Sequence, residues 1–583
     1  MSKRLVKAVI CQGDWHKEGR LCDFSFLSSS GFNLFDGGFL FDLDGNIPIR
    51  ELRKIFPQET KKKMRELKDK GILTFIYVDI TRMSREKFPL SEAKKFMAVE
   101  KDGSPNLIFK GRSYGACYNN PEWLKFIVET ATFYLEESGA DGIQYDIIQP
   151  FRDCFCPYCE EKFSQEVGKS LREVPSQRGE RNWKIRKLYL EWRLKNFIQF
   201  LRKLENHIRK KTGKPFLRMG TGHVRGGKDP LLFLHGVYDF FLFEEPWTYP
   251  PQNNVFAYKL AHALNTVGLV VTRVKEGIPT PSMLRVALAE GAAFGGNFTP
   301  WGFYIHESKD LEKVCQEHNQ FIEKTQEWFG NMEDEGEVGI IYSPTSHLFY
   351  EWELQGRKEP HALYFAQILL DLHIPFRILI PEKGEEKLDK FKLLILPDVG
   401  ILSSNWFRLL KDYVEKGGRI ISTGNSAFYD ESLERRKEKL EGDNVIQLPS
   451  CPEKDYVINR FYGPDYINLI RPPSPELTSL IFTALPDPCI KTEAPSTLLL
   501  NLRRRGKRWV LHLVNSDCNR GHMHLWLKTV KGVRIKLKLP GEIKRVENLT
   551  QENTNVTWSK EGEYLQISIP VIHHYAGIGW ELK

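Results

Sequence analysis

The chain has 583 residues and a formal net charge of +9. With 41% hydrophobic and 27% charged residues it can bury several cores, which excludes an intrinsically disordered protein. The small positive excess gives no reason to expect a nucleic-acid partner. The sequence contains no apolar run of about 18 residues, so we expect no contact with a membrane.

The first residues do not have the pattern of a targeting signal. Their short apolar stretch is interrupted by Lys7, which makes it too short for a signal-peptide core and favours a first strand. Ten cysteines in a chain of this length do not form a disulfide scaffold. We therefore expect a protein of the reducing cytoplasm.

Residues 1–330 alternate between strand and helix patterns. Helices are predicted at 58–70, 121–137 and 182–211. Strands are predicted at 5–12, 32–41, 72–80, 141–148, 216–222, 238–244, 269–274 and 293–298. Eight strands with intervening helices predict an α/β fold of the (β/α)8 TIM barrel type, with a doubly wound open sheet as the alternative.

Two further domains are predicted after the barrel. Residues 336–450 carry strands at 338–342, 376–380, 393–396 and 419–423, with helices at 361–372 and 406–416. This pattern predicts an open α/β sheet of flavodoxin-like or amidotransferase-like type. The turn at 397–400 lacks a cysteine nucleophile, so we exclude amidotransfer.

Residues 455–583 lack helical periodicity and contain short alternating strands, for example at 509–514, 533–539 and 565–569. They predict a C-terminal β-sandwich. A basic run at 503–508 lies between two apolar strands with Gly506 in its middle. We interpret it as a solvated hairpin turn rather than a nucleic-acid patch.

Three cysteines stand close together just after the fourth predicted strand. Cys154, Cys156 and Cys159 have C-x-C-x2-C spacing, and Cys117 lies upstream, before the preceding helix. Four thiolates can surround one tetrahedral soft metal, and this ligand set is typical of structural zinc. We expect a zinc that holds the loop beside the active site and no cofactor for catalysis. A metal-free thiol cluster or a disulfide is the alternative.

Acidic residues end several predicted barrel strands, where barrel enzymes place their chemistry. Asp146 ends the fourth strand, on the same face as Gln144, and we expect it to point into the cup at the carboxyl end of the barrel. Glu244 and Glu245 end the sixth strand, and Glu276 follows the seventh. We favour Glu245 as a general acid/base. The structural alternatives are a helix cap or loop anchor for Asp146 and solvated loop charges for the glutamates.

Two carboxyl groups that face each other across such a barrel end could carry out glycoside hydrolysis, which requires one on each side of the scissile bond. A separation of about 5.5 Å supports retention, and one of roughly 6.5–9.5 Å supports inversion. A ring such as Trp247 near Glu245 would favour the protonated acid. Hydroxyl recognition needs fixed polar groups and an apolar platform. The candidates for sugar binding, each of which alone is more often structural, are Asp14, Trp15, His16, Asp79, His223, Trp247 and Trp301.

The run Asp-Gly-Ile-Gln-Tyr-Asp at 141–146, followed by the cysteine run, resembles the barrel of glycoside hydrolase family 42 β-galactosidases. In that family three clustered cysteines and one upstream cysteine hold a structural zinc. Segments 338–344, 393–397 and 413–423 resemble its trimerisation domain, and 510–515 fits its terminal β domain. The resemblance implies a homotrimer in which the second domain contributes to the rim of a neighbour's cleft.

The chain departs from that family at the end of the fourth strand. Family 42 has Asn-Glu there, with Glu as the general acid/base, whereas this chain has Tyr145-Asp146. This strand end resembles relatives of the family and α-L-fucosidase-type barrels, in which the Asp is the nucleophile. The resemblance implies removal of a terminal galactose- or fucose-like sugar with retention, by Asp146 as nucleophile and Glu245 as acid/base.

Two alternatives remain at this point. In the family 42 arrangement Asp146 would be the acid/base and Glu276 the nucleophile. The rival class is a non-catalytic carbohydrate-binding or scaffold protein derived from a glycosidase. The missing Asn-Glu motif supports this alternative.

Overall fold

The computed structural model describes the whole chain except residues 1–5, 11–24, 38–44, 57–58, 176–182, 225–230, 235, 245–251, 272–279, 301–304, 307, 358, 385, 462–473, 517–526 and 552–553. Its largest described sheet has eight parallel strands in the order β1-β2-β3-β7-β8-β9-β10-β11. The strands are β1 (Ala8–Ile10), β2 (Leu34–Asp36), β3 (Leu73–Asp79), β7 (Gly142–Asp146), β8 (Leu217–Gly222), β9 (Phe240–Glu244), β10 (Val267–Val271) and β11 (Asn297–Phe298).

The two edges of this sheet meet. The amide of Ile10 in β1 donates to the carbonyl of Pro300, just after β11, at 3.1 Å. The amide of Ala8 donates to the side-chain oxygen of Asn297 at 3.0 Å. The predicted barrel is therefore confirmed, and the open sheet is excluded for this part of the chain.

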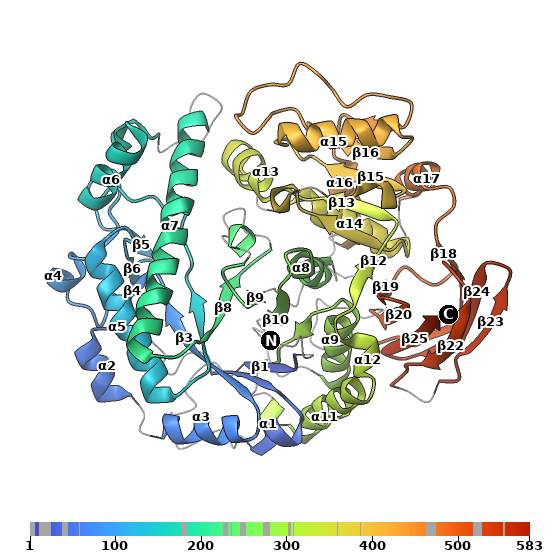
Figure 1. Cartoon of the computed structure of the whole chain (residues 1–583), viewed down its shortest axis with the longest axis horizontal. Coiled ribbons are helices and arrows are strands. Elements are labelled where there is room, and N and C mark those ends of the chain that lie inside the picture. Colours follow the sequence, from blue (N-terminus) through green and yellow to red (C-terminus); the bar gives the residue numbers. More distant parts are fainter. Residues whose placement is uncertain are drawn as a thin grey trace.

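Helices surround the barrel (Figure 1). They are α1 (Ser25–Ser29), α2 (Ile49–Ile55), α3 (Thr60–Asp69), α5 (Pro121–Ser138), α6 (Pro157–Val167), α7 (Trp183–Thr212), α8 (Gln252–Ala263), α9 (Pro281–Ala293) and α11 (Lys309–Lys324). Local chemistry explains the bounds of α5. The Asn120 side chain accepts from the amide of Glu122 at 2.9 Å, Pro121 occupies the first turn, and Gly139 ends the helix with a φ of 69°.

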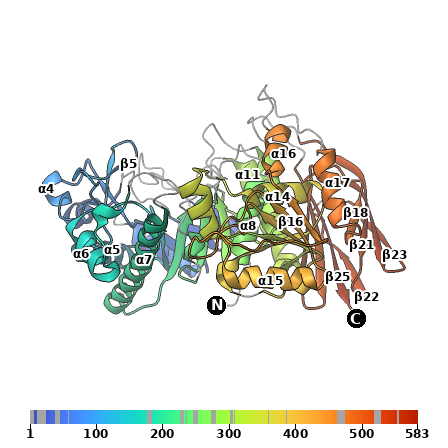
Figure 2. The same cartoon turned by 90° about the horizontal axis from the view of Figure 1, so that it is seen from above.

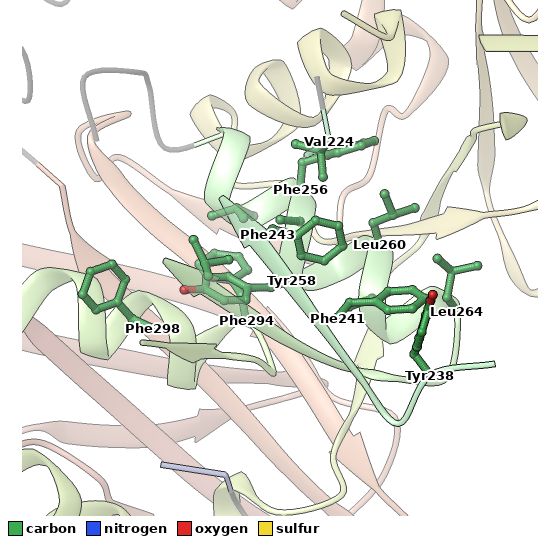
Figure 3. Close-up of a cluster of buried hydrophobic side chains, with 14 of the residues drawn as sticks. Val224, Tyr238, Phe241, Phe243, Phe256, Tyr258, Leu260, Leu264, Phe294 and Phe298 are labelled. Atoms are coloured by element: carbon green, nitrogen blue, oxygen red, sulfur yellow. The ribbon is translucent and has the colours of Figure 1, made fainter. Parts of the chain in front are cut away.

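Apolar side chains pack on both faces of the barrel sheet. Alternation sends Phe241 and Phe243 of β9 outward, where they join the same core as Phe256 and Leu260 of α8 (Figure 3). The inward-facing core consists of Ala8, Ile10, Leu34, Phe75, Met219, Phe240, Leu242, Leu269 and Val271.

A second parallel sheet has the order β14-β13-β15-β16-β17. Its strands are β13 (Val338–Ile341), β14 (Phe376–Leu379), β15 (Leu393–Pro397), β16 (Arg419–Thr423) and β17 (Val445–Leu448). This is the flavodoxin-like order, and it confirms the predicted fold of this part. The accompanying helices are α13 (Pro344–Ser346), the π-helix η5 (His347–Leu354), α14 (His361–Asp371), α15 (Ser404–Glu415) and α16 (Pro452–Phe461). Helix α14 packs against α8 of the barrel (Figure 1).

The C-terminal part is the predicted β-sandwich. Two antiparallel sheets, in the orders β12-β19-β20-β25-β22 and β18-β21-β24-β23, enclose an apolar core (Figure 2). The strands are β12 (Glu333–Glu335), β18 (Ile490–Thr492), β19 (Leu498–Arg505), β20 (Arg508–Asn515), β21 (Val530–Lys538), β22 (Ile543–Asn548), β23 (Thr557–Glu561), β24 (Tyr564–Ile572) and β25 (Tyr575–Leu582).

One expectation about this region is wrong, and a second holds only in part. Helix α17 (Pro475–Ala484) lies in the segment expected to lack helical periodicity, and its Leu477 and Ile481 are buried. The basic run does turn at Gly506 between β19 and β20, but Arg503 is only 3% exposed and donates to the carbonyl of Met332. Strand alternation turns Arg503 inward, so the run is not wholly solvated.

A small antiparallel sheet that sequence did not predict follows the third barrel strand. It consists of β4 (Arg82–Ser84), β5 (Leu107–Ile108) and β6 (Ser113–Gly115) in the order β4-β6-β5. Its first residue, Arg82, reaches the carboxyl end of the barrel, as described below. None of the described helices is long and apolar enough to cross a membrane.

Candidate active site

Among the described residues, four acidic side chains end barrel strands at positions that face inward. They are Asp36 of β2, Asp79 of β3, Asp146 of β7 and Glu244 of β9. Asp36, Asp79 and Glu244 lie an even number of residues from an inward-facing position of their own strands, and Asp146 pairs with Asp79 in the register, so all four point into the barrel. Asp79 and Asp146 are direct partners in the register of neighbouring strands.

One hydroxyl joins Asp79 to Asp146. The Tyr77 hydroxyl oxygen lies 2.8 Å from Asp79 Oδ1 and 2.6 Å from Asp146 Oδ2. The two carboxyl oxygens are therefore no farther apart than the sum of these lengths, and both belong to the same side of the cup. The Tyr77 hydroxyl has one proton, so it can donate to only one of the two carboxyl groups. In the other short contact the carboxyl group is protonated and donates to the hydroxyl oxygen.

The environment of Asp79 favours that proton. Burial raises the pKa of Asp79 to about 6, the charge of Asp146 adds to the rise, and the guanidinium of Arg82 opposes it. Arg82 Nη2 lies 2.8 Å and Nε 2.9 Å from Asp79 Oδ2. Burial and the two carboxylates hold the pKa of Tyr77 well above its ordinary value. The tyrosine therefore stays protonated, while Asp79 gains and loses a proton near pH 6.

The backbone after Asp146 fixes its other carboxylate oxygen. Asp146 Oδ1 accepts from the amide of Ile147 at 2.6 Å, and Thr81 donates to the carbonyl of Ile147 at 2.6 Å. Ile147 has a φ of 50°, a strained left-handed conformation for a β-branched residue. Such strain is concentrated at functional sites, where surrounding contacts maintain it. Here it holds a half-buried carboxylate in one orientation.

Glu244 and His223 form the other side of the cup. Glu244 is buried, and His223 follows β8, the strand between β7 and β9. His223 Nδ1 lies 2.6 Å from the main-chain oxygen of Glu244, so Nδ1 carries a proton, and Nε2 lies 3.8 Å from Glu244 Oε2. With one strand between them, the backbones of Asp146 and Glu244 are about 10 Å apart.

A buried polar layer lies beneath these groups. The amide of Gln144 lies between Asp36 and Thr221, and with its nitrogen toward Asp36 it donates to both carboxylate oxygens at 2.9 and 3.0 Å. Its oxygen then accepts from the Thr221 hydroxyl at 3.0 Å. This layer forms a rigid polar floor beneath the cup.

The structure thus brings four of the predicted site residues, Asp79, Asp146, His223 and Glu244, to one end of the barrel. The other predicted site residues lie outside the described part of the chain, and their roles stay predictions: Asp14, Trp15, His16, Glu245, Trp247, Glu276 and Trp301. Sequence reasoning missed Tyr77 and Arg82. The sequence could have revealed Tyr77, because the strand alternation that places Asp79 inward also places Tyr77 inward.

The four cysteines predicted to bind zinc lie together. Their sulfur atoms are all within 4.8 Å of one another, and Cys117 Sγ lies 3.5 Å from the sulfurs of Cys156 and Cys159. These distances exclude a disulfide, which requires about 2.05 Å. Sulfurs bound at about 2.3 Å to a tetrahedral zinc would lie roughly 3.8 Å apart, so the arrangement fits that ion. Zinc binding itself stays a prediction.

Polar neighbours of the cluster also suit thiolates. Arg193 Nη1 and Asn119 Nδ2 donate toward Cys159 Sγ at 3.5 and 3.4 Å, and Arg193 is buried. Arg193 Nε also donates to the carbonyl of Pro150 at 3.1 Å, as does the Tyr118 hydroxyl at 3.0 Å. The cluster is therefore tied to the loop that begins at Asp146.

No family model matches the sequence, and no curated protein matches it. Solved structures do match over the whole chain. An α-L-fucosidase (isoenzyme 2) from Paenibacillus thiaminolyticus is 15% identical with a TM-score of 0.72, and the match covers 100% of both chains.

Two β-galactosidases match in the same way. The enzyme from Bacillus circulans sp. alkalophilus is 12% identical with a TM-score of 0.66, over 99% of both chains. A catalytic mutant of a GH42 β-galactosidase from G. stearothermophilus is 12% identical with a TM-score of 0.66, over 100% of this chain and 98% of that one. The chain therefore has, over its whole length, the fold of these glycosidases, which is the fold that the sequence resemblance implied.

Proposed function

We propose that the protein is a retaining glycoside hydrolase that removes a terminal galactose- or fucose-like sugar from a glycan or glycoside. The observation that carries the proposal is Asp146 at the carboxyl end of the barrel, held by Tyr77 beside Asp79, with Glu244 on the other side of the cup. The whole-chain likeness to an α-L-fucosidase and to β-galactosidases supports the same chemistry.

In this proposal Asp146 is the nucleophile. The Ile147 amide and the Tyr77 hydroxyl each donate to one of its oxygens, so both oxygens are held in one orientation. Attack of a carboxylate oxygen on the anomeric carbon forms a glycosyl-enzyme, which water then hydrolyses with net retention. Tyr77 and Asp79 position the nucleophile.

The acid/base in this proposal comes from the end of β9. Glu245 is the first choice and Glu244 the second, and the described position of Glu244 supports this region as the opposite wall of the cup. The acid protonates the leaving oxygen and then, as a base, activates the water. The family 42 assignment, with Asp146 as acid/base and Glu276 as nucleophile, is the alternative within the same reaction class.

The proposal also includes a structural zinc, a reducing compartment and a trimer. The four buried cysteines are free thiols, which suits a reducing cytoplasm. The trimer follows from the resemblance of residues 338–344 and 393–423 to a trimerisation domain. Light scattering of the purified protein would test it, with a particle mass three times 67.8 kDa as the expected result.

A panel of nitrophenyl glycosides tests the function. We expect hydrolysis of an α-L-fucoside or a β-D-galactoside, loss of that activity in Asp146→Asn, and rescue by azide with a defined anomeric product. Asp69→Asn, at an exposed position in α3, is the control and should retain activity. Sugar binding without turnover of any glycoside would instead support the non-catalytic rival.

A further inference from the structure

A second group of chemically active side chains lies outside the barrel, in the flavodoxin-like sheet. In sheets of this order ligands bind at the carboxyl edge, where the strand order reverses, here between β13 and β15. Asp398 directly follows β15 and has a φ of 50°, a left-handed conformation. The π-helix η5 ends at Leu354, shortly before Arg357, and such segments occur frequently at functional sites.

Three potential metal ligands converge at this edge. One ligand atom each of His361, Asp398 and Cys451 lies within 4.8 Å of the others. His361 and Asp398 are buried, and Cys451 is half-buried. A Cβ atom on Gly424 would clash with the Asp398 carboxylate and the Cys451 sulfur, so the glycine permits their approach. Imidazole, carboxylate and thiol are together a donor set for ions of the zinc class.

A buried carboxylate orients the histidine. His361 Nδ1 lies 2.6 Å from Glu453 Oε1, which also accepts from the Thr423 hydroxyl at 3.0 Å. Because the carboxylate accepts, Nδ1 carries the proton, which leaves Nε2 as the ligand atom. Metal-binding histidines almost always have such a partner on the other nitrogen. Glu453 is fully buried, and its Oε2 has no hydrogen-bond partner among the residues that the structure describes.

The charged side chains around these ligands carry a net negative charge, which favours a bound cation. The carboxylates belong to Asp398 and Glu453, and the guanidinium of Arg357 contacts Asp398. These three charges sum to one negative charge in a mostly buried place, and buried charges are normally paired or bind metals.

We propose that His361, Asp398 and Cys451 bind a divalent ion of the zinc class, with Glu453 as the positioning residue for His361. Three protein ligands leave a fourth coordination position for water or another ligand. In the structure Arg357 Nη1 contacts Asp398 Oδ2 and lies 3.0 Å from His361 Nε2, where the ion would bind. Its side chain is 32% exposed, so ion binding requires Arg357 to turn toward solvent. Arg357 therefore competes with the metal.

The test is a titration of metal-stripped, full-length protein with Zn²⁺ by calorimetry and with Co²⁺ by absorption, which reports thiolate ligation. We expect Cys451→Ser to lose one equivalent of bound metal and the matching sulfur-to-cobalt band. Cys489→Ser is the control, because Cys489 is half-buried and belongs to neither thiol-containing group. The four-thiol cluster is intact in both variants, so metal bound there contributes equally to the metal content and the cobalt spectrum of both.

Two further variants separate a metal site from a structural charge network. Glu453→Gln should weaken the affinity of this site about 10- to 100-fold. Arg357→Ala should tighten it, because the competing cation is removed, while a merely structural network would lose stability and gain no metal. Equal metal content and equal cobalt spectra in Cys451→Ser and Cys489→Ser would overturn the proposal, as would an unchanged affinity in Arg357→Ala.

Discussion

Tyr77 holds both carboxyl groups of one wall of the cup through a single hydroxyl. Its effect depends on the cross-strand register, which pairs Asp79 with Asp146 and places Tyr77 two residues before Asp79. The strand-end rule for barrels predicted both aspartates from sequence. It did not predict the hydrogen bond between them, because register is a property of the folded sheet.

Replacement of Tyr77 by Phe removes that hydroxyl and keeps the ring. A hydrogen bond to a charged group contributes about 1.5–3 kcal/mol, so we expect kcat/KM to fall roughly 10- to 100-fold. Steady-state kinetics on the best nitrophenyl glycoside would measure this. Tyr145→Phe is the matched control, since the Tyr145 hydroxyl is buried and has no hydrogen-bond partner within the described structure. Equal losses in the two variants would contradict the role of Tyr77.

Asp79 should make stability fall as pH rises. Its pKa increases from 3.8 to about 6 on folding, so the protonated form stabilises the fold fully below about pH 4, and this contribution is lost as pH rises through 6. The rise corresponds to about 3 kcal/mol. Urea unfolding at pH 4 and pH 7 should show that the wild type loses more stability than Asp79→Asn over this interval. Parallel pH profiles of the two proteins would contradict the assignment.

At the scale of elements, the barrel strands were predictable because buried parallel strands are nearly continuous apolar runs. The same rule identified four strands of the second sheet. It could not identify the sheet formed by β4, β5 and β6, whose strands have two or three residues, or the π-helix η5, which has no separate sequence signature. Helix α17 was missed because ten residues give few turns of periodicity.

The cysteine cluster acts at the same scale, because it ties the loop after β7 to α5, α6 and α7. We expect one equivalent of zinc to copurify with the cluster, and a chelator to lower both the thermal midpoint and the activity. Arg193 and Tyr118 transmit this effect, since both hold the carbonyl of Pro150, four residues after Asp146.

Differential scanning calorimetry and activity assays with and without chelator would measure these losses. Cys156→Ser should show them without chelator, and Cys489→Ser should not. Unchanged midpoint and activity after complete removal of zinc would contradict a structural role.

At the scale of the whole molecule, one buried lysine joins the three parts of the chain. Lys259 of α8 donates to Asp334 Oδ2 in β12 at 3.1 Å, to Asn501 Oδ1 in β19 at 3.0 Å and to the carbonyl of Phe376 in β14 at 3.0 Å. Barrel, second sheet and sandwich therefore meet at one ammonium group. Its partners lie 75, 117 and 242 residues from it along the chain, so sequence could not reveal them.

Lys259→Met should destabilise the protein strongly, because it leaves Asp334 buried without its main cation. Breaking a buried ion pair costs on the order of 3–5 kcal/mol, whereas an exposed pair contributes about 1 kcal/mol or less. Lys390→Ala, which removes a surface pair with Glu386, is the control. Thermal unfolding should show a large fall in midpoint for the first variant and almost none for the second. Equal thermal midpoints in the two variants would contradict the role of Lys259 in holding the three domains together.

The most direct test of the proposed chemistry is covalent trapping of the nucleophile. The protein is incubated with a 2-deoxy-2-fluoro derivative of the sugar it hydrolyses, and the labelled peptide is sequenced by mass spectrometry. We predict one sugar on the peptide that contains residues 142–146, attached at Asp146. Turnover-dependent labelling of a different carboxylate, such as Glu276, would contradict the account.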